Sequence, residues 1–214
     1  MKIDLNGCGK SYNRRWLFRD LSCNFQSSES WALLGPNGSG KSTLSLLLCG
    51  QVWPTEGSIT WKLQDKAIAP EQLFAHIALA SPALELPEEF TFRELLDLQG
   101  RIKPFLVTDV ADVAKSLCDF DDKILDKPVY AYSSGMKQRV KLVLAALCDT
   151  PLLILDEPLT NLDTAGFRTY ERIIEQYTQH RLVIVASNRE DEYGFCNNRL
   201  RITPGAGVEV GSFV

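Results

Sequence analysis

The chain has 214 residues, of which 45% are hydrophobic and 23% are charged, and its formal net charge is -4. This composition is typical of one globular domain that is large enough to fold without disulfides or metals. The mildly acidic balance gives no sign of a nucleic-acid-binding surface. The longest apolar tract, residues 140–155, is interrupted by Lys141, Asp149 and Pro151, and this excludes a membrane span within it.

The six cysteines form no C-x-x-C pair, and the chain has only two histidines that could join them in a metal site. Residues 1–6 lack the apolar core of a signal peptide. We therefore expect reduced thiols and a cytosolic location. Any role at a membrane then requires a partner chain.

In chain order, short apolar runs alternate with longer helical patterns. The runs at 152–155 and 182–186 are apolar throughout, as in strands that are buried on both faces. Apolar residues that recur at three- and four-residue steps after residue 164 predict an amphipathic helix. The predicted elements are strand 30–34, helix 41–49, strands 58–61 and 77–80, helices from 91, at 108–118 and at 135–148, strand 152–155, helix 164–180 and strand 182–186.

This order predicts an α/β fold with a mostly parallel sheet that is flanked by helices. The first thirty residues contain strand-like pieces with no helix between them, so we expect them to form an antiparallel edge, as an N-terminal antiparallel β subdomain. Residues 88–132 have a helical pattern that begins with a capping box at Thr91 and Glu94. We interpret this stretch as a helical insertion within a single domain, residues 1–214.

A glycine-rich turn joins the first buried strand to the helix at 41–49 and matches G-x-x-x-x-G-K-[ST] in full. Glycines allow the backbone torsions that turn loop amides toward phosphate oxygens, and the following helix adds the partial positive charge of its N-terminus. Lys41 supplies a charge for the outer phosphates, and Ser42 offers a hydroxyl to Mg²⁺. The alternative is a plain strand–turn–helix corner. The predicted ATP-binding residues of this loop are Gly35, Pro36, Asn37, Gly38, Ser39, Gly40, Lys41, Ser42 and Thr43.

The buried strand at 152–155 ends in two carboxylates, Asp156 and Glu157. Ligands bind at the carboxyl ends of parallel strands, and Asp156 is predicted to hold Mg²⁺, directly or through water. Strand alternation directs Glu157 the other way, where it can orient and polarise the attacking water. Strands also end in acidic turns that have no catalytic role. This motif therefore indicates a catalytic site only in combination with the phosphate loop upstream.

The two motifs and the segment between them resemble the nucleotide-binding domain of ABC transporters, over nearly the whole chain. The most specific piece resembles the ABC signature loop and the helix after it, Tyr132-Ser133-Ser134-Gly135-Met136-Lys137-Gln138-Arg139. In that family the loop caps the ATP that is held by a second subunit. The resemblance therefore implies that Ser133 and the Gly135 amide contact a γ-phosphate across a dimer interface. Out of context, the same residues would be an ordinary N-capped helix.

Further positions fit this resemblance to a P-loop NTPase of the ABC type. Tyr12 matches the aromatic residue that stacks on adenine, although a tyrosine there is also compatible with an edge strand or a core. Residues 159–163 resemble the loop that crosses to the partner subunit, and Asp163 is its acidic position. The insertion at 88–132 corresponds to the helical subdomain that contacts a membrane permease.

Three departures from the family pattern stand out. The usual glutamine after the strand at 77–80 is replaced by Ser81 or Pro82, and of these only Ser81 can reach Mg²⁺, through water. The signature has Ser134 and Met136 where glycine and glutamine are commonest. The switch histidine is replaced by Asn188, which can donate a hydrogen bond to a γ-phosphate but carries no charge or proton near neutral pH, and which is also typical of a turn.

The leading hypothesis is an ATP-hydrolysing subunit of an ABC transporter. It would bind ATP and Mg²⁺, dimerise with a second ABC ATPase subunit, and lie on the inner face of the cell membrane through a transmembrane permease. The missing glutamine and histidine leave open a nucleotide-dependent switch with little turnover. A soluble ABC ATPase that acts on DNA or ribosomes is the third hypothesis, but the charge balance predicts no nucleic-acid partner.

Overall fold

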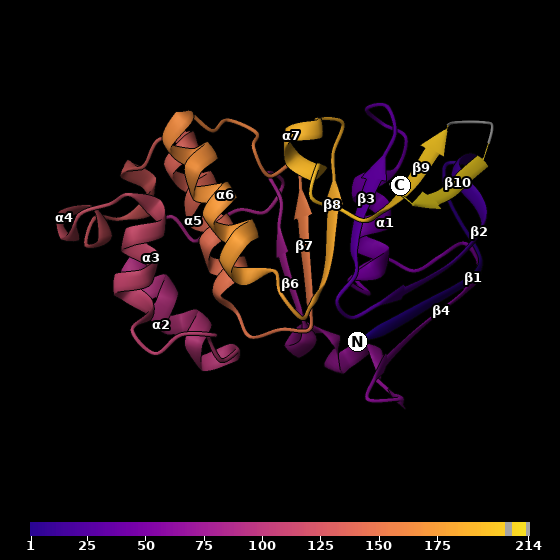
Figure 1. Cartoon of the computed structure of the whole chain (residues 1–214), viewed down its shortest axis with the longest axis horizontal. Coiled ribbons are helices and arrows are strands. Elements are labelled where there is room, and N and C mark those ends of the chain that lie inside the picture. The colour runs from indigo at the N-terminus through magenta and orange to yellow at the C-terminus, as the bar shows by residue number, and fades with distance from the viewer. Residues whose placement is uncertain (204–206, 213–214) are drawn as a thin grey trace.

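Two β-sheets organise the structure, a computed structural model that describes residues 1–203 and 207–212. The larger sheet has the strand order β10-β9-β3-β8-β7-β6, and the smaller one has the order β2-β1-β4-β5. Figure 1 shows the larger sheet in the middle of the molecule, with helices on one side and the smaller sheet on the other. The strands are β1 (Lys2–Tyr12), β2 (Arg15–Gln26), β3 (Ser30–Leu34), β4 (Glu56–Leu63), β5 (Lys66–Ala67), β6 (Ile77–Ala80), β7 (Leu152–Asp156), β8 (Leu182–Ala186), β9 (Asn198–Thr203) and β10 (Gly207–Ser212).

Strands β6, β7, β8, β3 and β9 run parallel, which confirms the predicted mostly parallel sheet. The predicted antiparallel N-terminal strands are also present, as β1 and β2, which pair with each other in the separate second sheet, where β1 also pairs with β4. The antiparallel edge of the main sheet has a different origin. It is β10, which pairs antiparallel with β9 and had no counterpart among the predicted elements.

The central strands are buried on both faces, because each face of the main sheet belongs to a different core. Along β7, Leu153 and Leu155 pack with the helical layer, whereas Leu152 and Ile154 pack toward helix α1 (Lys41–Leu48) and the antiparallel sheet. This alternation of side chains is the period of two that a pleated strand imposes. It explains why the run at 152–155 has no polar residue on either face.

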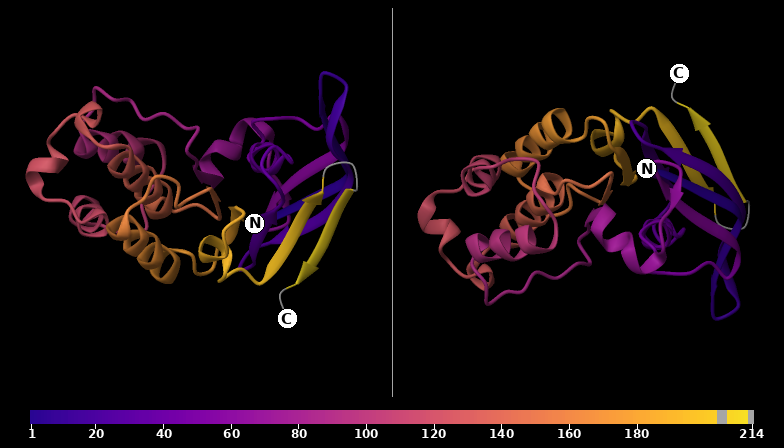
Figure 2. Two further views of the ribbon diagram at one scale, coloured as in Figure 1. Left: turned by 90° about the horizontal axis from the view of Figure 1, so that it is seen from above. Right: turned by 90° about the horizontal axis from the view of Figure 1, so that it is seen from below.

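Helices α5 and α6 cover one face of the main sheet, and α1 lies on the other face between the two sheets (Figure 2). Helix α6 ends three residues before the predicted boundary at 180, because His180 has a φ of 64° and cannot continue a right-handed helix. Among the described residues, no helix has the length and apolar character needed to cross a bilayer. The helices are α1 (Lys41–Leu48), η1 (Pro70–His76), α2 (Phe92–Ile102), α3 (Val110–Cys118), α4 (Asp122–Leu125), η2 (Val129–Ala131), α5 (Ser134–Leu147), α6 (Thr164–Tyr177) and α7 (Glu190–Tyr193).

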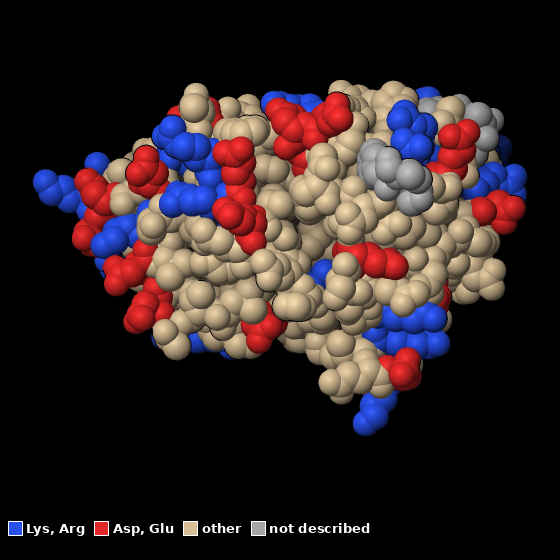
Figure 3. Space-filling model, in the orientation of Figure 1, with Lys and Arg blue, Asp and Glu red and all other residues tan. Residues whose placement is uncertain are grey.

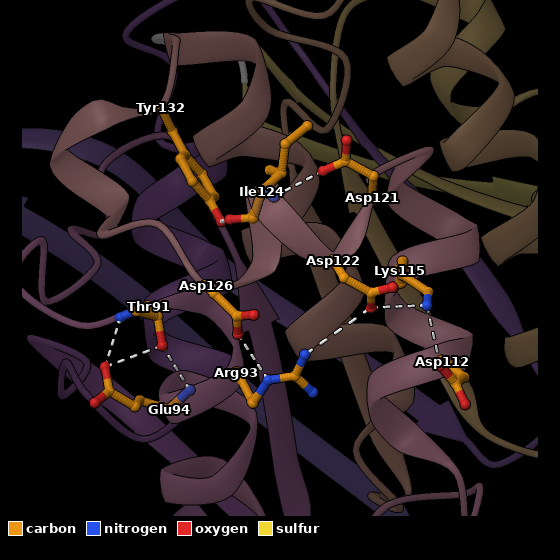
Figure 4. A network of polar contacts seen from close by, with 10 residues as sticks. All are labelled: Thr91, Arg93, Glu94, Asp112, Lys115, Asp121, Asp122, Ile124, Asp126 and Tyr132. Carbon is orange, nitrogen blue, oxygen red and sulfur yellow. Dashed lines mark hydrogen bonds and ion pairs between the residues drawn. The ribbon is translucent and has the colours of Figure 1, made fainter.

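A network of exposed charges ties the helices of the predicted insertion together (Figure 4). Arg93 of α2 pairs with Asp126 at 2.9 Å, and Lys115 of α3 pairs with Asp122 at 2.9 Å. Each of these pairs contributes little free energy in water, about 0–1 kcal/mol. Their geometric effect is to connect the short helix α4 and its flanking turn with both neighbouring helices. That residues 88–132 form a separate unit stays an interpretation.

Candidate nucleotide-binding site

A shallow hollow of about 240 Å³ lies at the carboxyl end of β3 and contains most of the residues that the phosphate-loop motif predicts. A larger hollow of about 590 Å³ lies at the opposite end of the sheet, beside Thr150 and Arg181, and contains none of the predicted site residues. We therefore identify the site by its chemistry rather than by its size. The smaller hollow is lined by Tyr12, Leu17, Asn37, Gly38, Gly40, Lys41, Ser42, Thr43 and Glu157.

The loop between β3 and α1 has the conformation that its glycines were expected to permit. Gly35, Gly38 and Gly40 all have positive φ angles, of 147°, 77° and 109°. At Gly35 a Cβ atom would lie 2.4 Å from the backbone carbonyl oxygen of Ile202, so the loop packs directly on β9 and excludes any side chain there. The loop is therefore a fixed feature of the fold rather than a plain corner.

Lys41 is the first residue of α1, and its side chain is buried beneath the loop that precedes it. Its ammonium group donates to the carbonyl oxygen of Gly35 at 2.8 Å and to that of Pro36 at 3.4 Å. Burial lowers the pKa of Lys41, while the nearby carboxylates of Glu157 and Asp156 act in the opposite direction. The structure thus places one buried cation and two carboxylates together at the start of α1.

Asp156, at the end of β7, receives hydrogen bonds from two serine hydroxyls. Ser42 of α1 donates to one carboxylate oxygen at 3.1 Å, and Ser81, just after β6, donates to the other at 3.1 Å. Burial raises the pKa of Asp156, and these two hydrogen bonds partly oppose that shift. The predicted metal residues Ser42, Asp156 and Ser81 are therefore brought together by three different elements.

Glu157 follows Asp156 but no longer belongs to the strand. Its φ of 44° lies in the left-handed region, which costs free energy for a residue with a side chain and is typical of strained functional positions. Its amide donates to the carbonyl oxygen of Ala186 at 2.9 Å, and its side chain lines the hollow beside Lys41 and Ser42. Strand alternation therefore does not apply to Glu157. The direction of its side chain is set instead by the turn that begins where β7 ends, at Asp156.

Asn188, in the turn after β8, reaches the phosphate loop. Its side-chain amide donates to the Asn37 side-chain oxygen at 2.9 Å, and both residues are exposed. Tyr12, at the end of β1, lines the far side of the hollow with its ring about half exposed, and the Lys10 ammonium lies 4.9 Å from the ring centre. The structure thus brings Tyr12 and Asn188 to the loop.

The remaining predicted residues lie elsewhere. Ser133 caps α5 by accepting a hydrogen bond from the Met136 amide, and Asp163 caps α6 by accepting one from the Gly166 amide at 2.9 Å. A Cβ on Gly135 would lie 2.9 Å from the Asn161 carbonyl oxygen, so the start of α5 is in contact with the segment before α6. None of Ser133, Gly135 and Asp163 lines the hollow at the phosphate loop.

One buried acid next to the site was missed by the sequence analysis. Glu192 of α7 is 1% exposed, and its carboxylate accepts hydrogen bonds from the Leu159 amide at 3.0 Å and from the Ser187 hydroxyl. It thereby connects the loop after Glu157 with the loop that carries Asn188. In sequence Glu192 is one of three consecutive acidic residues in a segment that reads as exposed, and Figure 3 shows acidic side chains gathered where α7 lies.

We expect Glu192→Gln to change how stability depends on pH. Burial raises the pKa of Glu192 above the ordinary 4.5, although both hydrogen bonds oppose the shift. The folded state therefore holds this proton more tightly than the unfolded state, and the stability that the group contributes is lost as the pH rises through its folded pKa. The melting temperature of Glu192→Gln should accordingly rise relative to that of the original protein as the pH increases above the ordinary pKa of 4.5. The control is Glu190→Gln, which changes an exposed acid on the same helix. If the difference in melting temperature from the original protein is independent of pH in both variants, the expectation is contradicted.

The fold and the site define a P-loop nucleotide-binding domain, with a glycine-rich loop, a lysine at the start of the helix that follows it, and a strand that ends in two carboxylates. The chain belongs to the ABC transporter family, whose sequence profile matches residues 18–160. It is an ATP-binding subunit of that family and an ATPase.

Known proteins support this assignment. Nod factor export ATP-binding protein I of Rhizobium johnstonii is 34% identical over 213 residues, which cover 98% of this chain and 68% of the relative. Six rhizobial relatives with this name are matched over 56% to 70% of their own length. A solved ATP-binding subunit of an ABC transporter superposes with a TM-score of 0.83 at 24% identity, covering 100% of this chain and 90% of that one. A dimeric ATP-binding cassette bound to ADP and Pi superposes with a TM-score of 0.81 at 18% identity, covering 99% of this chain and 100% of that one.

Proposed function

We propose that the hollow at the phosphate loop binds ATP together with Mg²⁺ and is the site of its hydrolysis. The observation that carries this proposal is the convergence of Ser42 and Ser81 on the Asp156 carboxylate, directly beside the buried Lys41. Loop amides and the start of α1 hold the phosphates, Lys41 balances their charge, and Thr43 follows Ser42 along the same wall. Tyr12 stacks on the adenine.

The residues present suit a magnesium ion. Hydroxyl and carboxylate oxygens are hard ligands of the kind that Mg²⁺ prefers, and Mg²⁺ is commonly held by one or two carboxylates together with substrate phosphates. The described part of the chain has no group of three or more histidine, cysteine or acidic residues that could hold a metal alone. A cation bound by Ser42 and Asp156 therefore needs phosphate oxygens as well. When bound, Mg²⁺ neutralises the charge that develops on the phosphates.

In the proposed reaction, a water oxygen forms a bond to the γ-phosphorus while the bond to the bridging oxygen breaks, so that ADP leaves. The proton that the water loses passes to the phosphate or to the solvent. Glu157 lies beside Lys41 and Ser42, where its carboxylate accepts a hydrogen bond from the water and orients it. Asn188, already bonded to Asn37 of the loop, donates its amide N–H to the γ-phosphate. No titratable group is required at position 188 for these steps.

The dimer is the second part of the proposal. Ser133, Gly135 and Asp163 lie outside the hollow of their own chain, which suits a role in covering the ATP of a second ABC ATPase subunit. The dimeric arrangement of the superposed cassette supports the same idea. The relatives that act in Nod factor export suggest a transmembrane permease as the further partner, contacted by the helices at 88–132. The protein would then be peripheral on the inner face of the cell membrane.

Steady-state ATP hydrolysis, measured against the concentration of the purified chain with Mg²⁺ present, tests this proposal. We expect turnover that rises faster than linearly with protein concentration, because each complete site needs two subunits, and that disappears in EDTA. Turnover that is strictly proportional to protein at all concentrations would contradict the dimer. Absence of both ATP binding and turnover would contradict the site itself.

A further inference from the structure

Helix α5 holds the two loop segments that contain the proposed magnesium residues. Gln138 is buried, and its side-chain amide donates to the Pro158 carbonyl oxygen at 3.1 Å, in the segment that follows Asp156. One turn further along the helix, the Lys141 ammonium donates to the carbonyl oxygens of Pro82 at 3.1 Å and Ser81 at 3.4 Å. The same helix is capped at its N-terminus by Ser133, in the loop that resembles the ABC signature.

The contact of Lys141 is not a surface ion pair. Its side chain is half-buried, and the hydrogen bonds that the structure gives its ammonium group go to backbone carbonyls rather than to a carboxylate. Burial lowers the pKa of Lys141, while Glu85 nearby acts in the opposite direction. Placing a partly desolvated ammonium group on two carbonyls fixes those carbonyls in return, because a charge that has lost part of its water needs other hydrogen-bond partners.

Lys141 contacts a short turn at residues 81–84, and this turn fixes the position of the Ser81 hydroxyl. Ser81 is 5% exposed, and its hydroxyl donates to Asp156 while accepting a hydrogen bond from the Ala83 amide at 3.3 Å. A turn is closed by the Leu84 amide, which donates to the Ser81 carbonyl oxygen at 3.2 Å. Pro82 has no backbone N–H, so this stretch has fewer backbone hydrogen bonds of its own to keep it in place. The two carbonyls held by Lys141 belong to Ser81 itself and to the residue that follows it.

We propose that Lys141 is a positioning residue for the magnesium side of the ATP site: it holds the Ser81–Pro82 carbonyls and thereby keeps the Ser81 hydroxyl on Asp156. The affinity of the site for its cation consequently depends on where helix α5 sits. Movement of α5, whose first turn carries Ser133 and Gly135, shifts the donor on which the Asp156 carboxylate relies. This inference rests on the proposed function, because it takes Asp156 as the carboxylate that holds Mg²⁺.

The test uses Lys141→Met, which keeps the aliphatic length and removes the ammonium group. The full chain is melted with the β,γ-imido analogue of ATP, first in EDTA and then over a series of Mg²⁺ concentrations. We expect the stabilisation by nucleotide in EDTA to stay unchanged. The Mg²⁺ concentration that gives half of the additional shift should rise about tenfold, as is typical when a residue that orients a metal ligand is lost. Ser81→Ala should give the same change, and the double variant should be no worse than either single one.

Lys103→Met is the matched control. Lys103 is also half-buried, its pKa is also lowered by burial, and it also donates to a carbonyl of this region, that of Ile77 at 2.6 Å, but at the opposite end of β6 from Ser81. It should lower stability without changing the half-saturating Mg²⁺ concentration. Lys141→Arg, whose guanidinium group can still donate to two carbonyls, should restore the magnesium response.

The outcomes separate the two proposals. If the original protein shows no nucleotide shift or no added shift with Mg²⁺, the proposed function fails. If the original protein shows both shifts but Lys141→Met matches Lys103→Met, the role of Lys141 is overturned. It is also overturned if Lys141→Met loses the nucleotide shift in EDTA, because the residue would then support the whole loop rather than its magnesium side.

Discussion

Replacing Glu157 by glutamine should lower ATP turnover by about 10²-fold or more while leaving ATP binding intact. Glu157 lines the hollow beside Lys41 and Ser42, yet the hydrogen bonds that hold the phosphate loop and Asp156 do not depend on its carboxylate. Its φ of 44° is a conformation that a residue with a Cβ adopts at a cost. The change to glutamine keeps the size of the side chain and removes the negative charge that orients and polarises the water.

Three measurements check this expectation: the ATPase rate, the shift in melting temperature with ATP and Mg²⁺, and the molar mass by light scattering. The ATP-bound variant should accumulate as a dimer, because hydrolysis no longer opens the site. Glu190→Gln, an exposed acid at the same end of the sheet, is the control and should keep the full rate. A Glu157→Gln variant that retains most of its turnover would instead support the nucleotide-dependent switch, and an ATP-bound variant that stays monomeric at high concentration would exclude the sandwich.

The parts of the site that were predictable from the sequence are those in which the backbone of one short segment itself forms the binding surface. The phosphate loop needs glycines at fixed spacing because the backbone itself surrounds the phosphates, and in the structure Gly35, Gly38 and Gly40 use the torsional freedom expected of them, with positive φ angles. The parallel strands were predictable because burial on both faces leaves an uninterrupted apolar run, as at 152–155. Both signals are contained in fewer than ten consecutive residues.

The parts that were missed depend on contacts between distant segments. Glu192 is buried because α7 folds back over the Leu159 amide and the Ser187 hydroxyl, and nothing in the acidic run of α7 distinguishes the buried carboxylate from its exposed neighbours. Lys141 is one lysine within a helix, and its function depends on a turn 60 residues earlier in the chain. The turn of Glu157 into the hollow follows from the end of β7 at Asp156, a boundary that periodicity alone does not fix.

A second large loss of ATP turnover is expected when Gly135 is substituted, although this residue lies away from the phosphate loop of its own chain. A Cβ there would lie 2.9 Å from the Asn161 carbonyl oxygen, which is backbone and cannot rotate away. Gly135→Ala therefore displaces the first turn of α5, and such a misplacement, in a residue that we propose covers the γ-phosphate, should cost about 10²-fold in turnover. ATP binding should remain, because Gly135 does not line the hollow. Gly100→Ala is the control, since its Cβ meets only the flexible Phe105 ring, at 3.2 Å.

Mixing two inactive variants then decides whether Gly135 acts on the same chain or on its partner. Lys41→Met removes the charge of the phosphate loop, and Gly135→Ala disturbs only the covering loop. In a mixed dimer, one of the two sites combines the intact phosphate loop of the Gly135→Ala chain with the intact covering loop of the Lys41→Met chain, so a mixture of the two should regain part of the original ATPase rate. If Gly135 acted within its own chain, every site in the mixture would carry one defect and no rate would return. A mixture that stays as inactive as its components, although light scattering shows that they dimerise, would therefore place the role of Gly135 within its own subunit.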